Sequence, residues 1–148
     1  MKRRVVVISA FAGLAMLAGC GSSDVSYKDG TYEARSAEYI NEDGSEEGNG
    51  YGIVTITIKD GAIAECTFKT YELDGTEKGE DYGMKSGSIA NKDFYNKAQK
   101  AVGACEKYAE QLVLAGRVDG VDAISGATIN YRQFVEAADA ALSQAEQK

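Results

Sequence analysis

The residues best suited to chemistry in this 148-residue chain form one short polar segment near its C-terminal end. Asp122 is followed three positions later by Ser125, and then directly by Gly126, Ala127 and Thr128. A helix is predicted to begin just beyond, and a helix N-terminus offers free N–H groups and a partial positive charge. Small residues also let a bulky group approach the backbone. The pattern therefore favours a site for a phosphate-bearing ligand, although a plain loop before a helix uses the same residues.

Composition excludes several other kinds of site. The chain has no histidine, so a Ser-His-Asp triad, a zinc site built on histidine and a haem with a proximal histidine are ruled out. The 23 acidic residues outnumber the 16 basic ones, and such a surface disfavours nucleic acid. The acidic segment 41–50 lacks the spacing of a calcium loop and is interpreted as a solvated hairpin loop. Any chemistry is expected to come from a cofactor rather than from catalytic side chains or a metal.

A long helix is predicted before the polar segment. Apolar side chains recur at helical spacing from about residue 93 to residue 114. Either Asn91 or Asp93 is suited to cap its start, and Gly116 follows its expected end. The stripe consists of Phe94, Ala98, Ala101, Val102, Cys105, Ala109 and Leu112.

A second helix is predicted after the polar segment, from about residue 131 to residue 144. Asn130 and Gln133 stand in the relation of N-cap and N3, which is a variant of the capping box. Thr128 is therefore expected just before this helix. Its apolar side is expected to consist of Phe134, Ala138, Ala141 and Leu142.

Strands are predicted in the first half of the chain. Residues 30–37 form a short strand, and apolar residues alternate with threonines in the segment 51–58. Residues 59–61 end in Asp-Gly, which is typical of a hairpin turn, and a return strand reaches about residue 71. Its alternation fails once, which predicts a bulge near residues 64–65. Strands first and helices later indicate an α+β domain, with two principal helices packed on a mainly antiparallel sheet.

The N-terminus has the layout of a secretory signal peptide. Three basic residues at positions 2–4 precede an uncharged run over 5–17, which is shorter than the roughly 20 residues of a spanning helix. The tetrad Leu17-Ala18-Gly19-Cys20 resembles the bacterial lipobox. That resemblance implies a diacylglyceryl group on Cys20.

This interpretation divides the chain into a signal peptide over 1–19, a lipidated cysteine with a polar tether over 20–26, and one domain over 27–145. Loss of residues 1–19 removes three basic and no acidic residues, which changes the formal net charge from −7 to −10. Because two acyl chains hold a protein stably on a bilayer, the protein is expected on the extracytoplasmic face of the cell membrane.

Two further cysteines, Cys66 and Cys105, remain in the expected domain. Both occupy apolar positions of their segments, which favours buried free thiols. A disulfide is the main alternative for an exported protein, and a redox-active pair is the least favoured.

The motif Asp122-x-x-Ser125-Gly126-Ala127-Thr128 resembles the flavinylation motif of the FMN-binding domain family. That family includes subunits of ion-pumping oxidoreductases and small lipoproteins linked to extracellular electron transfer. The resemblance extends over about residues 27–141. It implies that a FAD-dependent flavin transferase esterifies Thr128 with the phosphate of FMN. The short chain and the lipobox favour the lipoprotein branch over the pumps.

The resemblance also implies a role. The protein is expected to be an electron carrier rather than a stand-alone catalyst, taking electrons from a membrane quinone or dehydrogenase and passing them to an extracellular acceptor. Ser125 is expected to bind phosphate or ring edges, whereas Asp122 is expected to shape the turn or serve the transferase. A flavin-free binding or adhesion lipoprotein is the alternative. Candidates to stack on the flavin are Tyr51, Tyr71, Tyr82 and Tyr95, and the loop 78–83 is a candidate lining segment.

Overall fold

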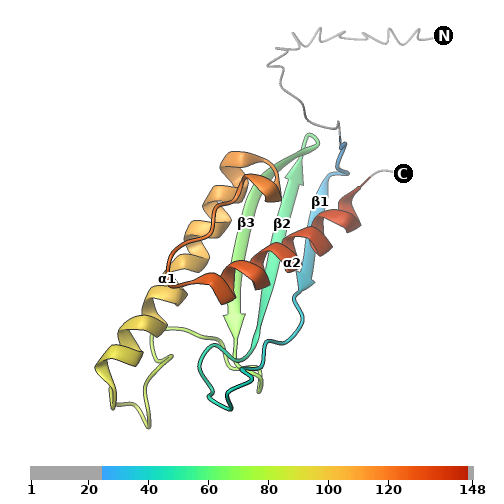
Figure 1. The fold of residues 1–148 in the computed structure, drawn as a ribbon. Coiled ribbons are helices and arrows are strands. Elements are labelled where there is room, and N and C mark those ends of the chain that lie inside the picture. The colour runs from blue at the N-terminus through green and yellow to red at the C-terminus, as the bar shows by residue number, and fades with distance from the viewer. Residues whose placement is uncertain (1–24, 147–148) are drawn as a thin grey trace, which may run out of the picture.

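The computed structural model describes residues 25–146 as three strands, two long helices and one short 3₁₀ helix (Figure 1). The elements in chain order are β1 (Gly30–Arg35), β2 (Tyr51–Lys59), β3 (Ala62–Tyr71), α1 (Lys92–Ala115), the 3₁₀ helix (Val118–Gly120) and α2 (Thr128–Ala145). The predicted α+β fold is confirmed. The predicted signal peptide, the lipid site at Cys20 and most of the tether lie outside the described residues.

The sheet is antiparallel and has the strand order β1-β2-β3. The β2–β3 turn contains Asp60 at φ 53° and Gly61 at φ 75°, the two positive φ values that this hairpin turn needs. The pairing register shifts after Thr57, which pairs with Glu65, because the next pair joins Ile58 to Ile63. The extra residue is at position 64, so the predicted bulge is confirmed.

Both helices pack on the same face of the sheet (Figure 1), with α2 across β1 and β2 and with α1 along β3. The inner face of β2 supplies Val54, Ile56 and Ile58 to the core. Tyr108 of α1 and Phe134 of α2 are fully buried against each other, with ring centroids 5.7 Å apart. No helix within residues 25–146 is both long and apolar enough to cross a bilayer.

Helix α1 begins and ends as its caps predict. Asn91 is the N-cap, and its Oδ1 accepts a hydrogen bond of 3.1 Å from the N–H of Phe94. Gly116 ends the helix at φ 70°, a left-handed conformation that glycine adopts without strain.

Helix α2 begins three residues earlier than predicted, and the predicted capping box is wrong. Its N-cap is Ala127, and no side chain caps the helix. Asn130 instead donates to the carbonyl of Ala101 at 2.9 Å, and Gln133 donates to the carbonyl of Gly50 at 3.0 Å. Both amides are buried and hydrogen-bond to neighbouring segments, so they are unavailable to the helix end.

Gly50 joins the acidic hairpin loop to the rest of the fold. It exchanges two backbone hydrogen bonds with Tyr39, of 2.7 and 2.9 Å, which close the predicted 41–50 loop. It adopts φ 133°, and a Cβ at this position would lie 1.9 Å from the carbonyl oxygen of Tyr71. Only glycine is compatible with this contact.

We therefore expect Gly50→Ala to lower the free energy of unfolding by at least about 2 kcal/mol, because it combines backbone strain with a steric clash. Gly103→Ala is the matched control, since a Cβ there meets no atom within 4 Å and alanine favours the helix by up to about 1 kcal/mol. Urea unfolding of both variants checks the expectation, and equal stability of the two would contradict it.

Candidate functional site

The hydroxyl of Tyr108 holds the turn that carries the predicted motif. It accepts a hydrogen bond of 2.9 Å from the N–H of Ile124 and donates one of 3.0 Å to the carbonyl of Ala127. The N–H of Ala127 also donates to the carbonyl of Ile124 at 3.0 Å, which closes a turn around Gly126 at φ 82°. Because Tyr108 is fully buried, the turn is fixed to the core.

The segment before the turn is held in place by hydrogen bonds to its main chain. The N–H of Asp122 donates to Oε1 of Gln111 at 2.8 Å, and the hydroxyl of Tyr131 donates to the carbonyl of Val121 at 3.2 Å. The side chain of Asp122 is exposed and makes no hydrogen bond or ion pair within the described part of the chain. Asp122 therefore contributes to the loop through its main chain.

Thr128 is the first residue of α2 and is exposed. Its hydroxyl makes no hydrogen bond to any of residues 25–146. The first helical hydrogen bond joins the N–H of Tyr131 to the carbonyl of Ala127, so the N–H groups of residues 128–130 have no helical partner. No acidic residue lies in this first turn. The arrangement leaves a free hydroxyl beside a helix end that attracts anions.

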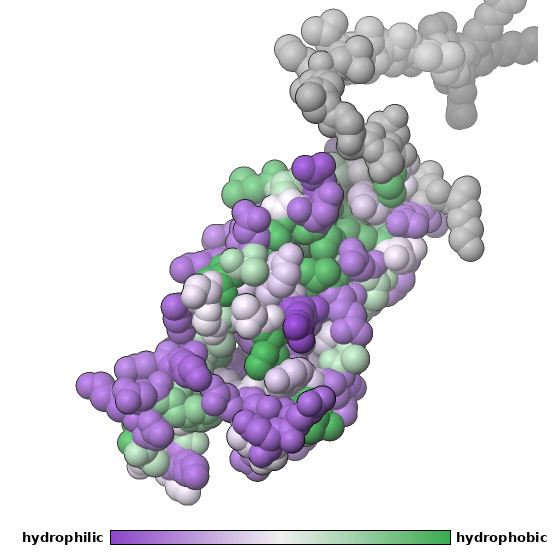
Figure 2. Space-filling model, viewed as in Figure 1, coloured by the Kyte–Doolittle hydropathy of each residue, from purple (hydrophilic) through white to green (hydrophobic). Residues whose placement is uncertain are grey.

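Thr128 borders a cavity of about 230 Å³. The walls come from the acidic hairpin loop, the 78–83 loop, the first half of α1 and the start of α2, and Figure 2 shows the surface indented at this end of the molecule. The lining residues are Glu47, Gly48, Thr70, Lys78, Tyr82, Phe94, Lys97, Ala98, Ala101, Val102, Gly126, Ala127, Thr128, Ile129 and Asn130. Three of the predicted site residues therefore line one cavity, whereas Ser125 and Asp122 lie outside it.

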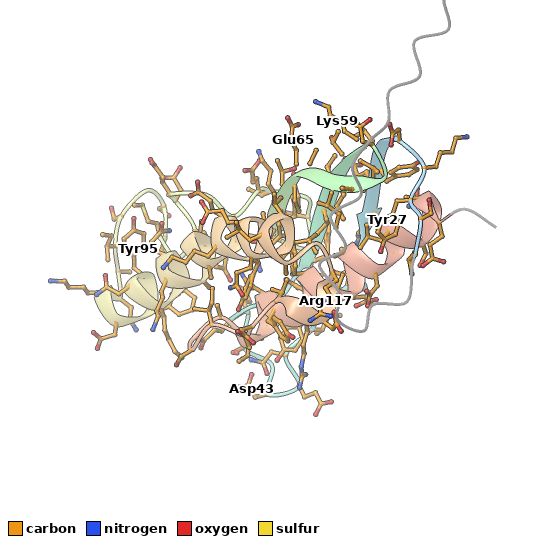
Figure 3. The ribbon with its side chains drawn as sticks, turned by 90° about the horizontal axis from the view of Figure 1, so that it is seen from above. Tyr27, Asp43, Lys59, Glu65, Tyr95 and Arg117 are labelled. Carbon is orange, nitrogen blue, oxygen red and sulfur yellow. The ribbon has the colours of Figure 1, made fainter. Side chains whose placement is uncertain are left out.

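Two of the four tyrosines suggested as stacking partners belong to another part of the molecule. Tyr51 and Tyr71 lie on the sheet face opposite the helices, where their rings stack at 5.4 Å and Arg35 covers Tyr51. Neither ring lines this cavity, because the alternation of the strands turns both side chains to the other face of the sheet. Tyr82 does line the cavity. Tyr95, which Figure 3 shows near the beginning of α1, donates to the carbonyl of Glu80 and is not in the lining.

Positive charge gathers around the cavity although the protein is acidic overall. Lys97 pairs with Glu47 at 2.7 Å. The side chain of Lys100 lies against Gly126, since a Cβ built on that glycine would be 3.4 Å from Nζ. Lys78 is buried, and its Nζ donates to the carbonyl of Gly48 at 3.2 Å. Because Lys97 is paired with Glu47, the net attraction of the site for anions comes from Lys78 and Lys100.

Sequence reasoning missed Tyr108, Lys97 and Lys100. The signal for Tyr108 is its spacing, since it continues the apolar stripe between Cys105 and Leu112. The two lysines lie three positions apart on α1, where neighbours share a face. Their proximity to residues 126–128 follows only from the packing of α1 beside α2.

Both cysteines of the domain are free, so neither the disulfide nor the redox pair is present. Cys105 is buried as predicted, whereas Cys66 is only partly buried. Burial raises the pKa of the Cys66 thiol to about 12 and also raises the pKa of Cys105. Both thiols are therefore protonated near neutral pH and are poor nucleophiles.

We expect Tyr108→Phe to lower the free energy of unfolding by about 1–3 kcal/mol, because it removes the partners of a backbone N–H and a carbonyl in the core. The amide of Ile124 should also exchange its hydrogen faster in the folded protein. Tyr32→Phe is the matched control: its hydroxyl bonds to the exposed carbonyl of Lys28, where water replaces it. Unchanged exchange at Ile124 would contradict the role of Tyr108.

Two solved structures are similar to this chain. A Clostridium perfringens protein of known crystal structure is similar at 22% identity and a TM-score of 0.55, covering 80% of this chain and 88% of its own. A Clostridium thermocellum protein solved by NMR is 24% identical over 79% of this chain and 91% of its own, with a TM-score of 0.42.

No curated protein matches the chain. At these identities, the C. perfringens likeness shows the fold alone. The model of the FMN-binding domain matches residues 47–143, a range that includes the last four residues of the acidic loop, all residues that line the cavity, and Thr128. The chain belongs to the FMN-binding domain family and is a flavin-binding protein.

Proposed function

We propose that this protein is an extracytoplasmic electron carrier that holds FMN covalently on Thr128 and is tethered to the membrane through Cys20. One observation carries the proposal. The Thr128 hydroxyl is exposed and unbonded within the described chain, at an uncapped helix N-terminus on the border of a cationic cavity. A transferase can reach such a hydroxyl, and the helix end favours the phosphate that it would deliver.

The residues around Thr128 fit the phosphate of FMN. A phosphodiester keeps one negative charge, which the N–H groups at the start of α2 and the nearby ammonium of Lys100 can stabilise. Ser125 is exposed one residue before Gly126 and offers a further hydroxyl. Asp122 is expected to serve during attachment, because its exposed carboxylate makes no contact that the fold requires.

The size of the cavity suits a carrier. Pockets that enclose a drug-sized ligand occupy about 300–1,000 Å³, whereas this one has about 230 Å³. Part of FMN would therefore remain accessible to redox partners. When bound, FMN supplies the transfer of one or two electrons. The chain contributes binding, orientation and charge.

The proposed lipid on Cys20 would hold this carrier at the membrane surface. Membrane binding through acyl chains needs no spanning helix. The expected donors are a membrane quinone or a dehydrogenase, and the expected acceptor is extracellular. The anchor keeps the domain near such donors and leaves it outside the cytoplasm.

We expect Thr128→Ala to abolish covalent flavin. Wild type and variant are produced with a FAD-dependent flavin transferase and separated on a denaturing gel viewed for flavin fluorescence, and their intact masses are measured. Wild type should fluoresce and carry one FMN unit less one water. Ser143→Ala is the control, because its exposed hydroxyl lies on the same helix but in the last turn, at the end opposite Thr128.

Three outcomes of this experiment separate the alternatives. Fluorescence that survives Thr128→Ala would place the bond elsewhere. A yellow native protein that loses its flavin on denaturation would show noncovalent FMN. A colourless wild type would support a flavin-free binding or adhesion lipoprotein.

We expect Cys20→Ala to leave flavin attached to Thr128 and to release the protein from the membrane. Without the lipidated cysteine, no acyl chain holds the domain. Fractionation of cells into membrane and soluble material, followed by flavin fluorescence of each fraction, measures both effects. Retention of the variant in the membrane fraction would contradict anchoring through Cys20.

A further inference from the structure

Lys78 is a buried cation at the cavity, and it forms no salt bridge with any of residues 25–146. Its side chain is 6% exposed. The ammonium donates to the carbonyl of Gly48 at 3.2 Å and lies 4.8 Å from the ring centroid of Tyr82. An ammonium has three donors, so two of them have no partner in the described chain.

Such an arrangement is costly unless a ligand completes it. An ammonium removed from water loses several kcal/mol of solvation, and proteins normally offset this loss by an opposite charge. Here burial lowers the pKa of Lys78 to about 8, although the negative charge of Glu72 acts in the opposite direction. The group therefore remains largely charged at neutral pH.

The three lysines of the site differ in position. Lys100 lies beside Gly126 and is exposed, so it is close to the position of the phosphate. Lys97 is neutralised by Glu47. Lys78 alone is buried, and it also lines a second groove of about 710 Å³ between β3 and α1. It is thus the cation that a ligand meets inside the cavity rather than at the edge.

We propose that Lys78 binds the ring of FMN and stabilises the negative charge that the ring gains on reduction, which makes the reduction potential more positive. When the ring takes two electrons from the donor and one proton from water, it gains one negative charge. A fixed cation near a flavin ring favours that charged state. The proposal rests on FMN occupying this cavity, but not on the ester bond to Thr128.

A purely structural role is the competing explanation. Lys78 connects the 78–83 loop to Gly48, so its removal could simply loosen the cavity. Stability and flavin content would then change, whereas the difference in affinity between oxidised and reduced FMN would not. The reduction potential measures that difference directly, and it separates the two roles.

The experiment compares FMN-loaded wild type with Lys78→Met, Lys78→Arg and Lys100→Met by spectroelectrochemical titration. Lys78→Met keeps the length of the side chain and removes its charge. We expect it to weaken the preference for reduced FMN at least tenfold, which corresponds to about 30 mV toward negative potential for a two-electron couple. Lys78→Arg retains the charge, and its preference for reduced FMN should stay within threefold of the wild-type value. Lys100→Met should shift the potential less than Lys78→Met.

Several outcomes would overturn the proposal. One is a Lys78→Met potential equal to that of wild type, and another is a larger shift from Lys100→Met. If Lys78→Met does not fold, Lys78→Arg serves as the test. A change of more than threefold in its preference for reduced FMN, although the positive charge is retained, would refute the role of charge. Noncovalent FMN would disprove the ester but leaves the titration valid. A chain that binds no FMN at all would refute both proposals.

Discussion

Tyr108 places its hydroxyl between the N–H of Ile124 and the carbonyl of Ala127, and its ring packs against Phe134 in the middle of the core. One side chain thereby joins three parts of the fold: α1, the motif-bearing turn and α2. The turn needs this support because its conformation depends on Gly126 at positive φ, and a loop without such anchors would sample many conformations. The position of Thr128 at the start of α2 is a consequence of this buried hydrogen bonding.

The charge around the cavity is opposite in sign to the net charge of the chain. The chain carries a formal net charge of −7, and an excess of negative charge repels other anions. Around the cavity Lys78 and Lys100 reverse this sign locally, whereas Lys97 is paired with Glu47. Two of these lysines lie on one face of α1, and the third follows β3. The net negative charge of the protein thus repels anionic ligands, whereas the cavity attracts them.

The sequence was sufficient to predict the elements wherever local signals dominate. The Asp60-Gly61 turn, the bulge and the Asn91 cap depend on neighbouring residues, and all three appear in the structure. The start of α2 could not be predicted in this way. Asn130 and Gln133 have the spacing of a capping box, but partners more than 25 residues away compete for their amides. Local patterns fail where buried polar groups find distant partners.

The same limit applies to the site. The motif residues could be identified because they are contiguous, and Gly126, Ala127 and Thr128 do line one cavity. Tyr51 and Tyr71 were misleading because aromatic residues on the outer face of a sheet resemble ligand contacts in composition. Tyr82 lines the cavity, whereas the pleat of the strands directs Tyr51 and Tyr71 to the sheet face that neither helix covers.

The direction of β2 has a consequence for the proposed electron carrier. The strand starts at Tyr51, directly after the acidic hairpin loop that borders the cavity, and ends at the β2–β3 turn, where Asp60 and Gly61 donate to Asp29 near the N-terminal end of the described residues. Nine residues at about 3.3 Å each separate these ends by roughly 30 Å. A lipid on Cys20 would therefore leave the flavin at the far pole of the domain. If the proposed donor lies inside the bilayer, exchange with it would require the domain to turn over, and the rate of that rotation would set an upper limit on turnover.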